Sequence, residues 1–273
     1  MTSAPFLGSS VGVRLVGIVN VTPDSFSDGG RFLSPALAVE HGRRLVAQGA
    51  WAVDVGGEST RPGAVPVSAD EELDRIVPVI AQLADDGVRV SVDTRRAAVA
   101  EEAVDAGARL INDVGGLRDP RMIAVAATHA VPVVVMHAPA ANPADAHRHR
   151  GYHDVVAEVV AFLAERAGAA HAAGVPGIIV DPGLGFGKTP EDNVQLIVGL
   201  DALTSLGHPV LVGASRKRFV GVIAGVEHPA DRDVATVAVH LAAIERGARL
   251  LRVHDVAGHV QALRVWHAIN QRS

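Results

Sequence analysis

The stretch VRVSVDTRRAAVAEEAVDAGARLINDVGG, residues 88–116, holds one copy of a unit that repeats along the chain. It starts with a short β-branched run, continues through an alanine-rich segment of helical period and returns to a second apolar run. The helical segment ends at Gly107, and glycine suits a helix end because the left-handed conformation there carries no steric penalty. This order predicts a strand, a helix and a second strand parallel to the first.

The same unit recurs on both sides of this stretch, about every 30 residues. Nearly continuous apolar runs are typical of parallel strands covered by helices. The predicted strands span residues 13–21, 51–57, 88–94, 109–116, 131–138, 177–183, 208–215 and 249–256. The predicted helices span residues 35–49, 69–87, 96–107, 120–130, 155–174, 190–207, 231–247 and 258–271, and six of the first seven end at glycine.

Eight such units in 273 residues predict an α/β protein with a closed (β/α)₈ TIM barrel rather than an open doubly wound sheet. Length alone is compatible with two smaller domains, but no linker divides the chain. We therefore expect a single domain over residues 1–273, with residues 1–12 as a flexible N-terminal segment. The irregular stretch 138–151 is expected to be a mobile loop after the fifth strand.

Composition excludes several classes of protein. Hydrophobic residues make up 48% of the chain and charged residues 20%, which is enough for a large core. A net charge of −5 argues against nucleic acid as a partner. The chain has no cysteine, which excludes a disulfide scaffold, a thiol nucleophile and a zinc-thiolate site. No signal peptide and no membrane-spanning run is recognisable, so we expect no membrane partner and a cytoplasmic location.

Polar residues stand near the ends of the predicted strands. In a barrel these ends meet at one mouth, where active sites lie. Taken singly, each would more often be a turn former, a helix cap or a packed histidine. Their convergence from separate strands favours a site. The residues concerned are Asn20, Asp54, Asp93, Asn112, Asp113, His137, Asp181, Ser215, Arg216, Lys217, Arg252, His254 and Asp255.

Two glycine-rich turns follow the second and sixth strands. GGESTRPGA, residues 56–64, offers backbone N–H groups with Thr60 and Arg61 to an anion. DPGLGFGKT, residues 181–189, superficially suggests a phosphate loop, but its glycine spacing does not match that motif. We interpret the second turn as a tight approach beside a flat ligand.

Together these strings resemble the motif set of the dihydropteroate synthases, over nearly the whole chain from about Leu15. The carrying motifs are IVNVTPDSFSDGG at 18–30, DVGGESTRPGA at 54–64, SVDT at 91–94, INDVGG at 111–116, DPGLGFGKT, GASRKRFVG at 213–221 and RVHDV at 252–256. The resemblance implies a transferase of folate biosynthesis. Its substrates would be 6-hydroxymethyl-7,8-dihydropterin pyrophosphate and p-aminobenzoate.

The resemblance also implies roles for individual residues. A pterin deep in the barrel would contact Asp93, Asn112, Met136, Asp181, Phe186 and Lys217. The pyrophosphate would contact Thr60, Arg61, Arg252 and His254, and Asn20 would bind Mg²⁺. Asp93, Asp181, Lys217, Arg252 and His254 are the expected catalytic residues. Departure of pyrophosphate leaves positive charge on the pterin, which Asp93 and Asp181 could stabilise.

The p-aminobenzoate pocket is implied to form when the loops after the first two strands close. Phe26 and Pro62 would form its wall, and Lys217 with Arg218 would hold the carboxylate. Many bacterial relatives have serine in place of Arg218, so this arginine either pairs with the carboxylate or points to solvent.

Two alternatives share part of this pattern. A pterin-dependent methyltransferase domain has the same barrel and pterin edge, but no use for the STRPG, SRK and RVH strings. A non-catalytic pterin-binding paralogue would lack Asn20, Lys217 or Arg252, and all three are present. A homodimer is expected by family analogy.

Overall fold

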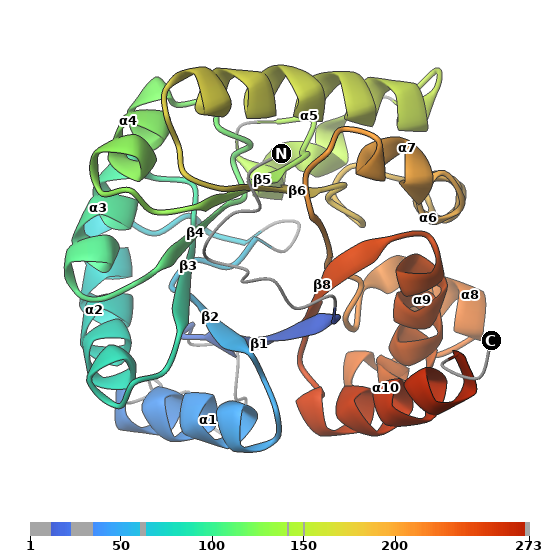
Figure 1. Cartoon of the computed structure of the whole chain (residues 1–273), viewed down its shortest axis with the longest axis horizontal. Coiled ribbons are helices and arrows are strands. Elements are labelled where there is room, and N and C mark those ends of the chain that lie inside the picture. The colour runs from blue at the N-terminus through green and yellow to red at the C-terminus, as the bar shows by residue number, and fades with distance from the viewer. Residues whose placement is uncertain (1–11, 23–34, 61–63, 141, 150, 271–273) are drawn as a thin grey trace.

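The computed structural model describes residues 12–22, 35–60, 64–140, 142–149 and 151–270. Eight parallel strands form a closed barrel in sequence order, with β1 paired to both β2 and β8. Helices surround the strands, as Figure 1 shows. The strands are β1 (Arg14–Asn20), β2 (Ala52–Gly56), β3 (Val90–Thr94), β4 (Leu110–Asp113), β5 (Val133–Met136), β6 (Ile178–Asp181), β7 (Val210–Val212) and β8 (Ala248–Val253).

The helices follow the predicted rhythm. The α-helices are α1 (Pro35–Ala47), α2 (Ala69–Asp85), α3 (Ala97–Asp105), α4 (Pro120–Thr128), α5 (Val155–Ala172), α6 (Pro190–Val198), α7 (Leu200–Thr204), α8 (Arg218–Ala224), α9 (Asp233–Glu245) and α10 (Val256–Asn270). Two 3₁₀ turns, η2 (Pro143–Arg148) and η3 (Pro229–Arg232), complete the described elements. The single-domain (β/α)₈ barrel is confirmed. The predicted N-terminal segment, apart from Gly12, lies outside the described residues.

The predicted glycine ends of the helices are confirmed by the backbone. All six glycines are left-handed, with φ between 75° and 115°, and the remaining helix, α4, is followed by Ala130, which is also left-handed with φ 51°. Each left-handed residue reverses the chain toward the next strand. These turns lie at the amino end of the barrel and leave the carboxyl end for longer loops.

Beyond small shifts of helix ends, the structure differs from the prediction in three places. The helix expected over 190–207 is interrupted at Gly199, where an added Cβ would lie 3.1 Å from the side chain of Val156 on α5. Helix α8 was not predicted, because seven residues give too little periodicity to recognise. The 138–151 loop contains the turn η2, whose start is capped by Asn142 Oδ1 accepting from Ala144 N at 3.1 Å.

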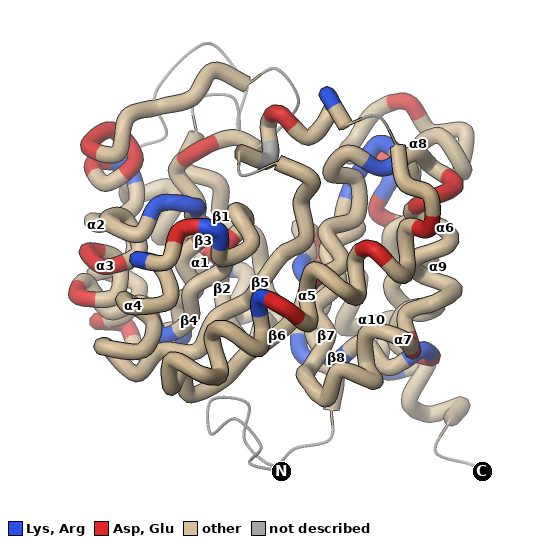
Figure 2. Tube along the Cα trace, turned by 90° about the horizontal axis from the view of Figure 1, so that it is seen from above, with Lys and Arg blue, Asp and Glu red and all other residues tan. Residues whose placement is uncertain are grey.

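Residues of both charges occur along the described chain. Figure 2 shows acidic and basic residues interspersed on the helices in this view. Among the described residues, no helix is long and apolar enough to cross a membrane.

Candidate active site

The interior of the barrel ends in a polar layer at the carboxyl ends of the strands. Below it lies an apolar layer of Val16, Leu110, Val134, Ile179, Leu211 and Leu250. Side chains two residues apart on a strand point to the same side. Asn112, Met136, Asp181 and Arg252 therefore face the barrel axis directly above the apolar layer. This alternation places the predicted site residues of β4, β5, β6 and β8 together.

The strand register adds Asn20 and Asp93 to the inward-facing residues at the carboxyl ends of the strands. Asn20 pairs with Gly56, Gly56 with Asp93, and Asp93 with Asn112. Gly56 has no side chain, and a Cβ there would lie 3.3 Å from Asp93 Cβ. Gly56 therefore leaves room between Asn20 and Asp93.

Arg252 is the centre of the charged network. Its Nε donates to Asp54 Oδ2 and its Nη2 to Asp93 Oδ2, both at 2.6 Å. Asn112 Nδ2 donates to the same Asp54 oxygen at 2.9 Å. Asp54 is 1% exposed, and Arg252 is its ion-pair partner. The sequence placed Asp54 at the mouth without giving it a role, because the partner lies 198 residues away.

Burial raises the pKa values of two aspartates at the mouth, Asp93 and Asp181. Burial raises the pKa of Asp93 to about 7, with Asp54 and Glu72 adding to the effect and Arg252 and Lys217 opposing it. Burial also raises the pKa of Asp181, against the charge of Lys217 and a backbone hydrogen bond from Gly183.

Lys217 and Phe186 lie together at the other side of the mouth. Burial lowers the pKa of Lys217 to about 8, although Asp181 and Asp93 favour its charged form. Its ammonium donates to the carbonyl of Leu184 and lies 4.4 Å from the centre of the Phe186 ring. Phe186 packs against an apolar cluster that includes Met136. This side of the mouth offers flat apolar contact beside a cation.

The turn after β6 requires its glycines. An added Cβ on Gly183, at φ 63°, would lie 1.8 Å from the carbonyl oxygen of His137. Lys188 stabilises this turn through hydrogen bonds to its backbone. Its Nζ donates to the carbonyls of Gly183 at 2.9 Å and Phe186 at 3.2 Å and lies 3.0 Å from His137 Nδ1. The GKT string thus contains a lysine that binds its own loop, and sequence reasoning missed this role.

His254 lies beside the turn after β7. Ser215 Oγ lies 2.9 Å from His254 Nδ1 and accepts from His254 N at 3.1 Å. Thr60 is partly buried after β2, and Arg218 is exposed on the first turn of α8. Phe26, Arg61 and Pro62 lie outside the described residues. Six predicted residues therefore share the polar layer, namely Asn20, Asp93, Asn112, Met136, Asp181 and Arg252.

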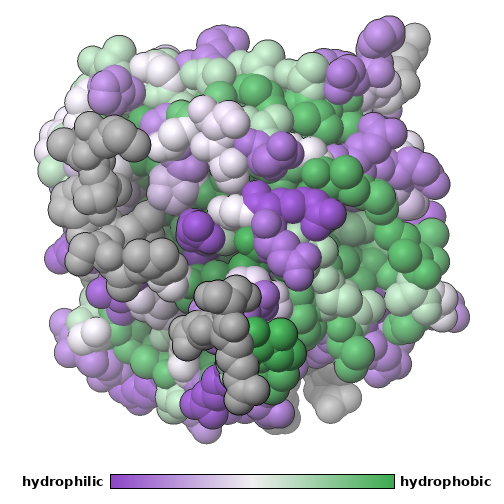
Figure 3. Space-filling model, turned by 45° about the vertical axis from the view of Figure 1, so that its right-hand side comes forward, coloured by the Kyte–Doolittle hydropathy of each residue, from purple (hydrophilic) through white to green (hydrophobic). Residues whose placement is uncertain are grey.

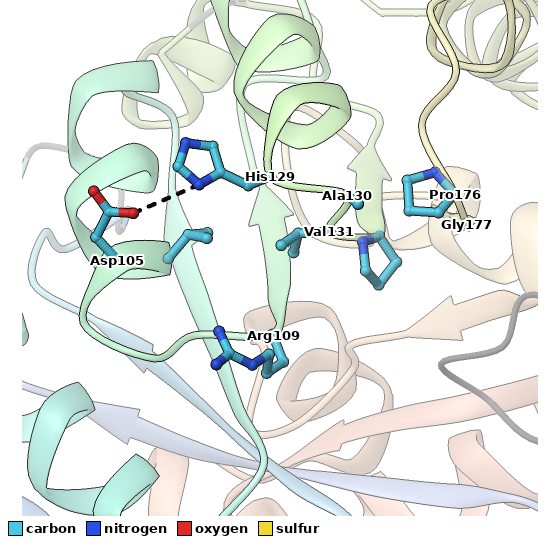
Figure 4. Close-up of a pocket in the computed structure, with 9 residues that line it drawn as sticks. Asp105, Arg109, His129, Ala130, Val131, Pro176 and Gly177 are labelled. Carbon is cyan, nitrogen blue, oxygen red and sulfur yellow. Dashed lines mark ion pairs between the residues drawn. The ribbon is translucent and has the colours of Figure 1, made fainter.

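A second pocket, of about 480 Å³, lies at the opposite end of the barrel. Figure 4 shows Arg109, His129 and Asp105 around it, with His129 Nδ1 3.5 Å from Asp105 Oδ1. Its lining residues Arg109, Pro132 and Gly177 come directly before β4, β5 and β6. Since barrel active sites occupy the carboxyl end, this pocket is not the candidate site.

Comparison with known proteins places the chain in one family. A family model described as pterin binding enzyme matches residues 16–254. A dihydropteroate synthase from Mycobacterium leprae is 49% identical over 261 residues, covering 93% of this chain and 92% of the relative. The chain belongs to the dihydropteroate synthases. It is accordingly a transferase.

Solved dihydropteroate synthases have the same fold. The enzyme from Xanthomonas albilineans with 4-aminobenzoic acid superposes with a TM-score of 0.89 at 51% identity, covering 95% of this chain and 94% of that one. The enzyme from Thermus thermophilus in complex with 6HMPPP gives 0.85 at 49% identity, with the same coverages. The chain spans 30% of a Haloferax volcanii relative, a probable bifunctional folylpolyglutamate synthase/dihydropteroate synthase, at 49% identity over 256 residues.

Proposed function

We propose that the enzyme joins 6-hydroxymethyl-7,8-dihydropterin pyrophosphate to p-aminobenzoate, with release of pyrophosphate, in folate biosynthesis. The amine nitrogen forms a bond to the pterin methylene carbon, the bond from that carbon to the pyrophosphate oxygen breaks, and the amine loses a proton. The observation that carries this proposal is the buried polar layer in which Arg252 joins Asp54 and Asp93. Family membership and the two ligand-bound relatives support it.

The pterin is proposed to lie on the polar layer. Asp181 would accept from adjacent ring N–H groups, and Asn112 would bind another edge. Support comes from Asn112 Oδ1 and Asp54 Oδ1, which are buried and accept no hydrogen bond within the described part of the chain. Met136 and Phe186 would contact the flat faces, and Lys217 would donate to ring acceptors.

The developing positive charge on the pterin is proposed to be stabilised by Asp93 and Asp181. Arg252 and His254 would bind the leaving pyrophosphate, together with Thr60 and Arg61. In this scheme, bound pyrophosphate competes with Asp93 for the guanidinium of Arg252 and weakens the Arg252–Asp93 ion pair. Asp93 then becomes more available to the pterin.

A Mg²⁺ ion is proposed to bind with the pyrophosphate, and the residues present fit such an ion. Asn20 carries an amide oxygen and pairs in register with Gly56, where a Cβ would lie 3.3 Å from Asp93 Cβ. Among the described residues, no group of three or more His, Asp or Glu could hold a metal on its own. This suits Mg²⁺, which keeps waters and substrate phosphates in its shell. When bound, the ion would neutralise charge on the leaving group.

The p-aminobenzoate carboxylate is proposed to bind Lys217 and Arg218, against a wall formed by Phe26 and Pro62. Arg218 is exposed and starts α8, where it can reach a ligand that arrives from solvent. We propose that p-aminobenzoate binds after the pterin pyrophosphate, because the pterin layer belongs to strand ends, whereas the sequence predicts that the wall residues belong to loops.

The test is turnover. Release of pyrophosphate that depends on both substrates supports the proposal, and pterin binding without turnover overturns it. Asp181→Asn should weaken pterin binding roughly 30–150-fold, whereas Asp105→Asn in the opposite pocket should leave it unchanged. Equal affinities for the two variants would remove Asp181 from the site.

The pH profile gives a second test. Catalysis should need ionised Asp93, whose pKa is about 7, and charged Lys217, whose pKa is about 8. The rate constant kcat/KM should therefore fall below pH 7 as Asp93 is protonated and fall above pH 8 as Lys217 loses its proton. A flat profile from pH 6 to 9 would contradict these roles.

A homodimer is also proposed. Apolar side chains gather on neighbouring helices of one side of the molecule (Figure 3). The exposed members are Val194 and Val198 on α6, Val222 and Ile223 on α8, and Val234 on α9. Light scattering should give twice the chain mass of 28.3 kDa, and Val234→Glu should reduce it. The cytoplasmic location stays a prediction, which fractionation of expressing cells would test.

A further inference from the structure

The turn after β7 carries residues of the mouth in an unusual backbone conformation. Residues 214–217 include Ser215, which binds His254, and Lys217. Between them, Arg216 has φ 59°, a left-handed conformation that is uncommon for a residue with a side chain. Such a conformation persists only where the surrounding structure holds it.

The first turns of α9 hold Arg216 from both sides. Asp233 accepts from Arg216 Nε at 2.8 Å and from Arg216 Nη2 at 2.7 Å, a bidentate pair. Thr236 Oγ1 accepts from Arg216 N at 3.2 Å, and Arg232 Nη1 donates to Arg216 O at 3.0 Å. The guanidinium and both backbone groups of the left-handed residue are thus fixed by one neighbouring segment.

A buried pair of histidines continues this contact one helical turn further. His240 on α9 and His259 on α10 are 1% and 2% exposed. Ala214 N donates to His240 Nε2 at 3.2 Å, His240 Nδ1 lies 2.8 Å from His259 Nε2, and His259 Nδ1 lies 2.6 Å from the carbonyl of Asp255. This series of hydrogen bonds ends in two backbone groups: Ala214 N, in the turn after β7, and the carbonyl of Asp255, the residue after His254.

The two backbone groups determine which ring nitrogen of each histidine carries the proton. Since Ala214 N–H can only donate, His240 Nε2 must accept and its proton lies on Nδ1. His259 Nε2 must then accept and Nδ1 carries the proton that the Asp255 carbonyl receives. Protonation of His240 would place a second N–H group opposite the Ala214 N–H, and two donors cannot bind each other. The series of hydrogen bonds therefore requires two neutral rings. Burial accordingly lowers the pKa of both histidines, that of His240 well below 6.5.

Asp233, Thr236 and His240 lie on one face of α9, at spacings of three and four residues. We propose that this face, extended by His259, is a positioning element for catalysis that fixes the β7 turn so that Lys217 and the Ser215–His254 pair point into the barrel mouth. None of its residues touches substrate. The inference rests on the proposed roles of Lys217 and His254, but its geometric part is independent of them.

The geometric part is tested by nitrogen NMR of the histidine rings in the wild-type enzyme at pH 7. The expected spectrum shows His240 and His259 neutral, each with its proton on Nδ1. A proton on Nε2 of His240, or a charged ring, would overturn the proposal whether or not the enzyme turns over.

The catalytic part is tested by two substitutions at the same position. In His240→Gln the amide oxygen reaches the place of Nε2 and still accepts from Ala214, whereas in His240→Asn the shorter amide reaches only the place of Nδ1. We expect His240→Asn to lower kcat/KM on the order of tenfold to a hundredfold, and His240→Gln to restore most of it. His267→Asn, on the far part of α10 with its Nδ1 on the Leu263 carbonyl, is the control for the exchange itself.

A readout beyond loss of activity separates positioning from damage. The pKa of Lys217 is set by burial, then by Asp181, Arg252 and Asp93. If the turn shifts, Lys217 becomes more hydrated, and the basic limb of kcat/KM should move upward by at least about half a pH unit. Equal activity of the Asn and Gln variants, or a loss with an unmoved limb that follows the folded fraction, would overturn the proposal. Absence of turnover in the wild type would instead refute the proposed function.

Discussion

Two parts of the barrel mouth are supported in different ways. After β2 and β3 lies an ion-pair network of Glu58, Glu72, Arg95 and Arg96, which we term the arginine brace. Arg96 pairs with Glu72 and, at 2.9 Å, with Glu58, while Arg95 Nε also binds Glu58 at 2.9 Å. After β7 and β8 lies the face of α9 with His259, which we term the α9 brace. It contains two buried neutral histidines that contact each other and the β7 turn.

The difference lies in what happens when one partner is lost. Glu72 is 0% exposed, so its charge can stay buried only while Arg96 balances it. The histidines of the α9 brace carry no charge, and loss of one leaves only unpaired dipoles. The arginine brace therefore depends above all on Arg96, whereas the α9 brace depends on the protonation state of its rings.

The largest effect is expected at Arg96. Arg96→Met should lower the free energy of unfolding by about 3–5 kcal/mol, because it leaves Glu72 buried without a counter-charge. Arg95→Met should have a much smaller effect, since Arg96 still pairs with Glu58. Urea denaturation measures both. Similar losses for the two variants would show that the arginine brace does not depend on the buried charge.

The stability loss of Arg96→Met should also depend on pH, in a direction that the pKa of Glu72 determines. Burial already raises the pKa of Glu72 despite Arg96, and removal of that charge raises it further. A raised carboxyl pKa means that the folded state binds more protons than the unfolded state above pH 4.5. The deficit of the variant should therefore grow as the pH rises from 5 to 8.

A smaller effect is expected in the α9 brace. His240→Leu should cost about 1–3 kcal/mol, because it leaves His259 Nε2 and Ala214 N–H without partners. Adding His259→Leu removes one of these unpaired groups, so the double variant should lose less than the sum of the single losses. Strict additivity in the double-mutant cycle would mean that the two rings do not interact.

The third effect is the acid sensitivity of the wild-type chain. His240 and His259 have folded pKa values below the unfolded value of 6.5, so the unfolded state binds more protons below that pH. Their contribution is complete above pH 6.5 and is lost as the pH falls toward the folded pKa values. At pH 5.5 the loss should reach up to about 1.4 kcal/mol for each histidine. The double leucine variant should show a shallower fall, and an equally steep one would assign the acid sensitivity elsewhere.

The smallest effect is expected for an exposed ion pair. Arg43 and Asp86 lie 2.7 Å apart, with 52% and 28% of their side chains exposed. Arg43→Ala should change stability by less than about 1 kcal/mol, since water screens the pair. Calorimetry would detect a larger change, which would indicate that charge alone, rather than burial, makes the arginine brace sensitive.

The sequence predicted the barrel and much of the mouth because both follow from local pattern. Apolar runs and glycine-ended helices determine the units, and closure of the barrel brings the strand ends together. Asn112, Asp181 and Arg252 were therefore predictable as neighbours of one another.

Pairings between distant units could not be predicted. Nothing in the sequence near Asp54 indicates that Arg252 binds it, and His240 lies in an alanine-rich helix whose pattern shows only a buried face. The role of Lys188 was missed because it depends on how the loop folds back on itself. Such contacts depend on register and side-chain reach across the barrel, which periodicity does not contain.

Closure of the barrel through β1 and β8 has a consequence during synthesis. Arg14 pairs with Leu250, so the first strand cannot complete its pairing until 236 more residues have been added (250 − 14). Ribosomes add roughly 5–20 residues per second, so one edge of β1 waits on the order of 10–50 s. The same late strand brings Arg252, the counter-charge of Asp54 and Asp93. On the nascent chain these two carboxylates must stay hydrated until β8 arrives, so the final strand both seals the sheet and neutralises the mouth.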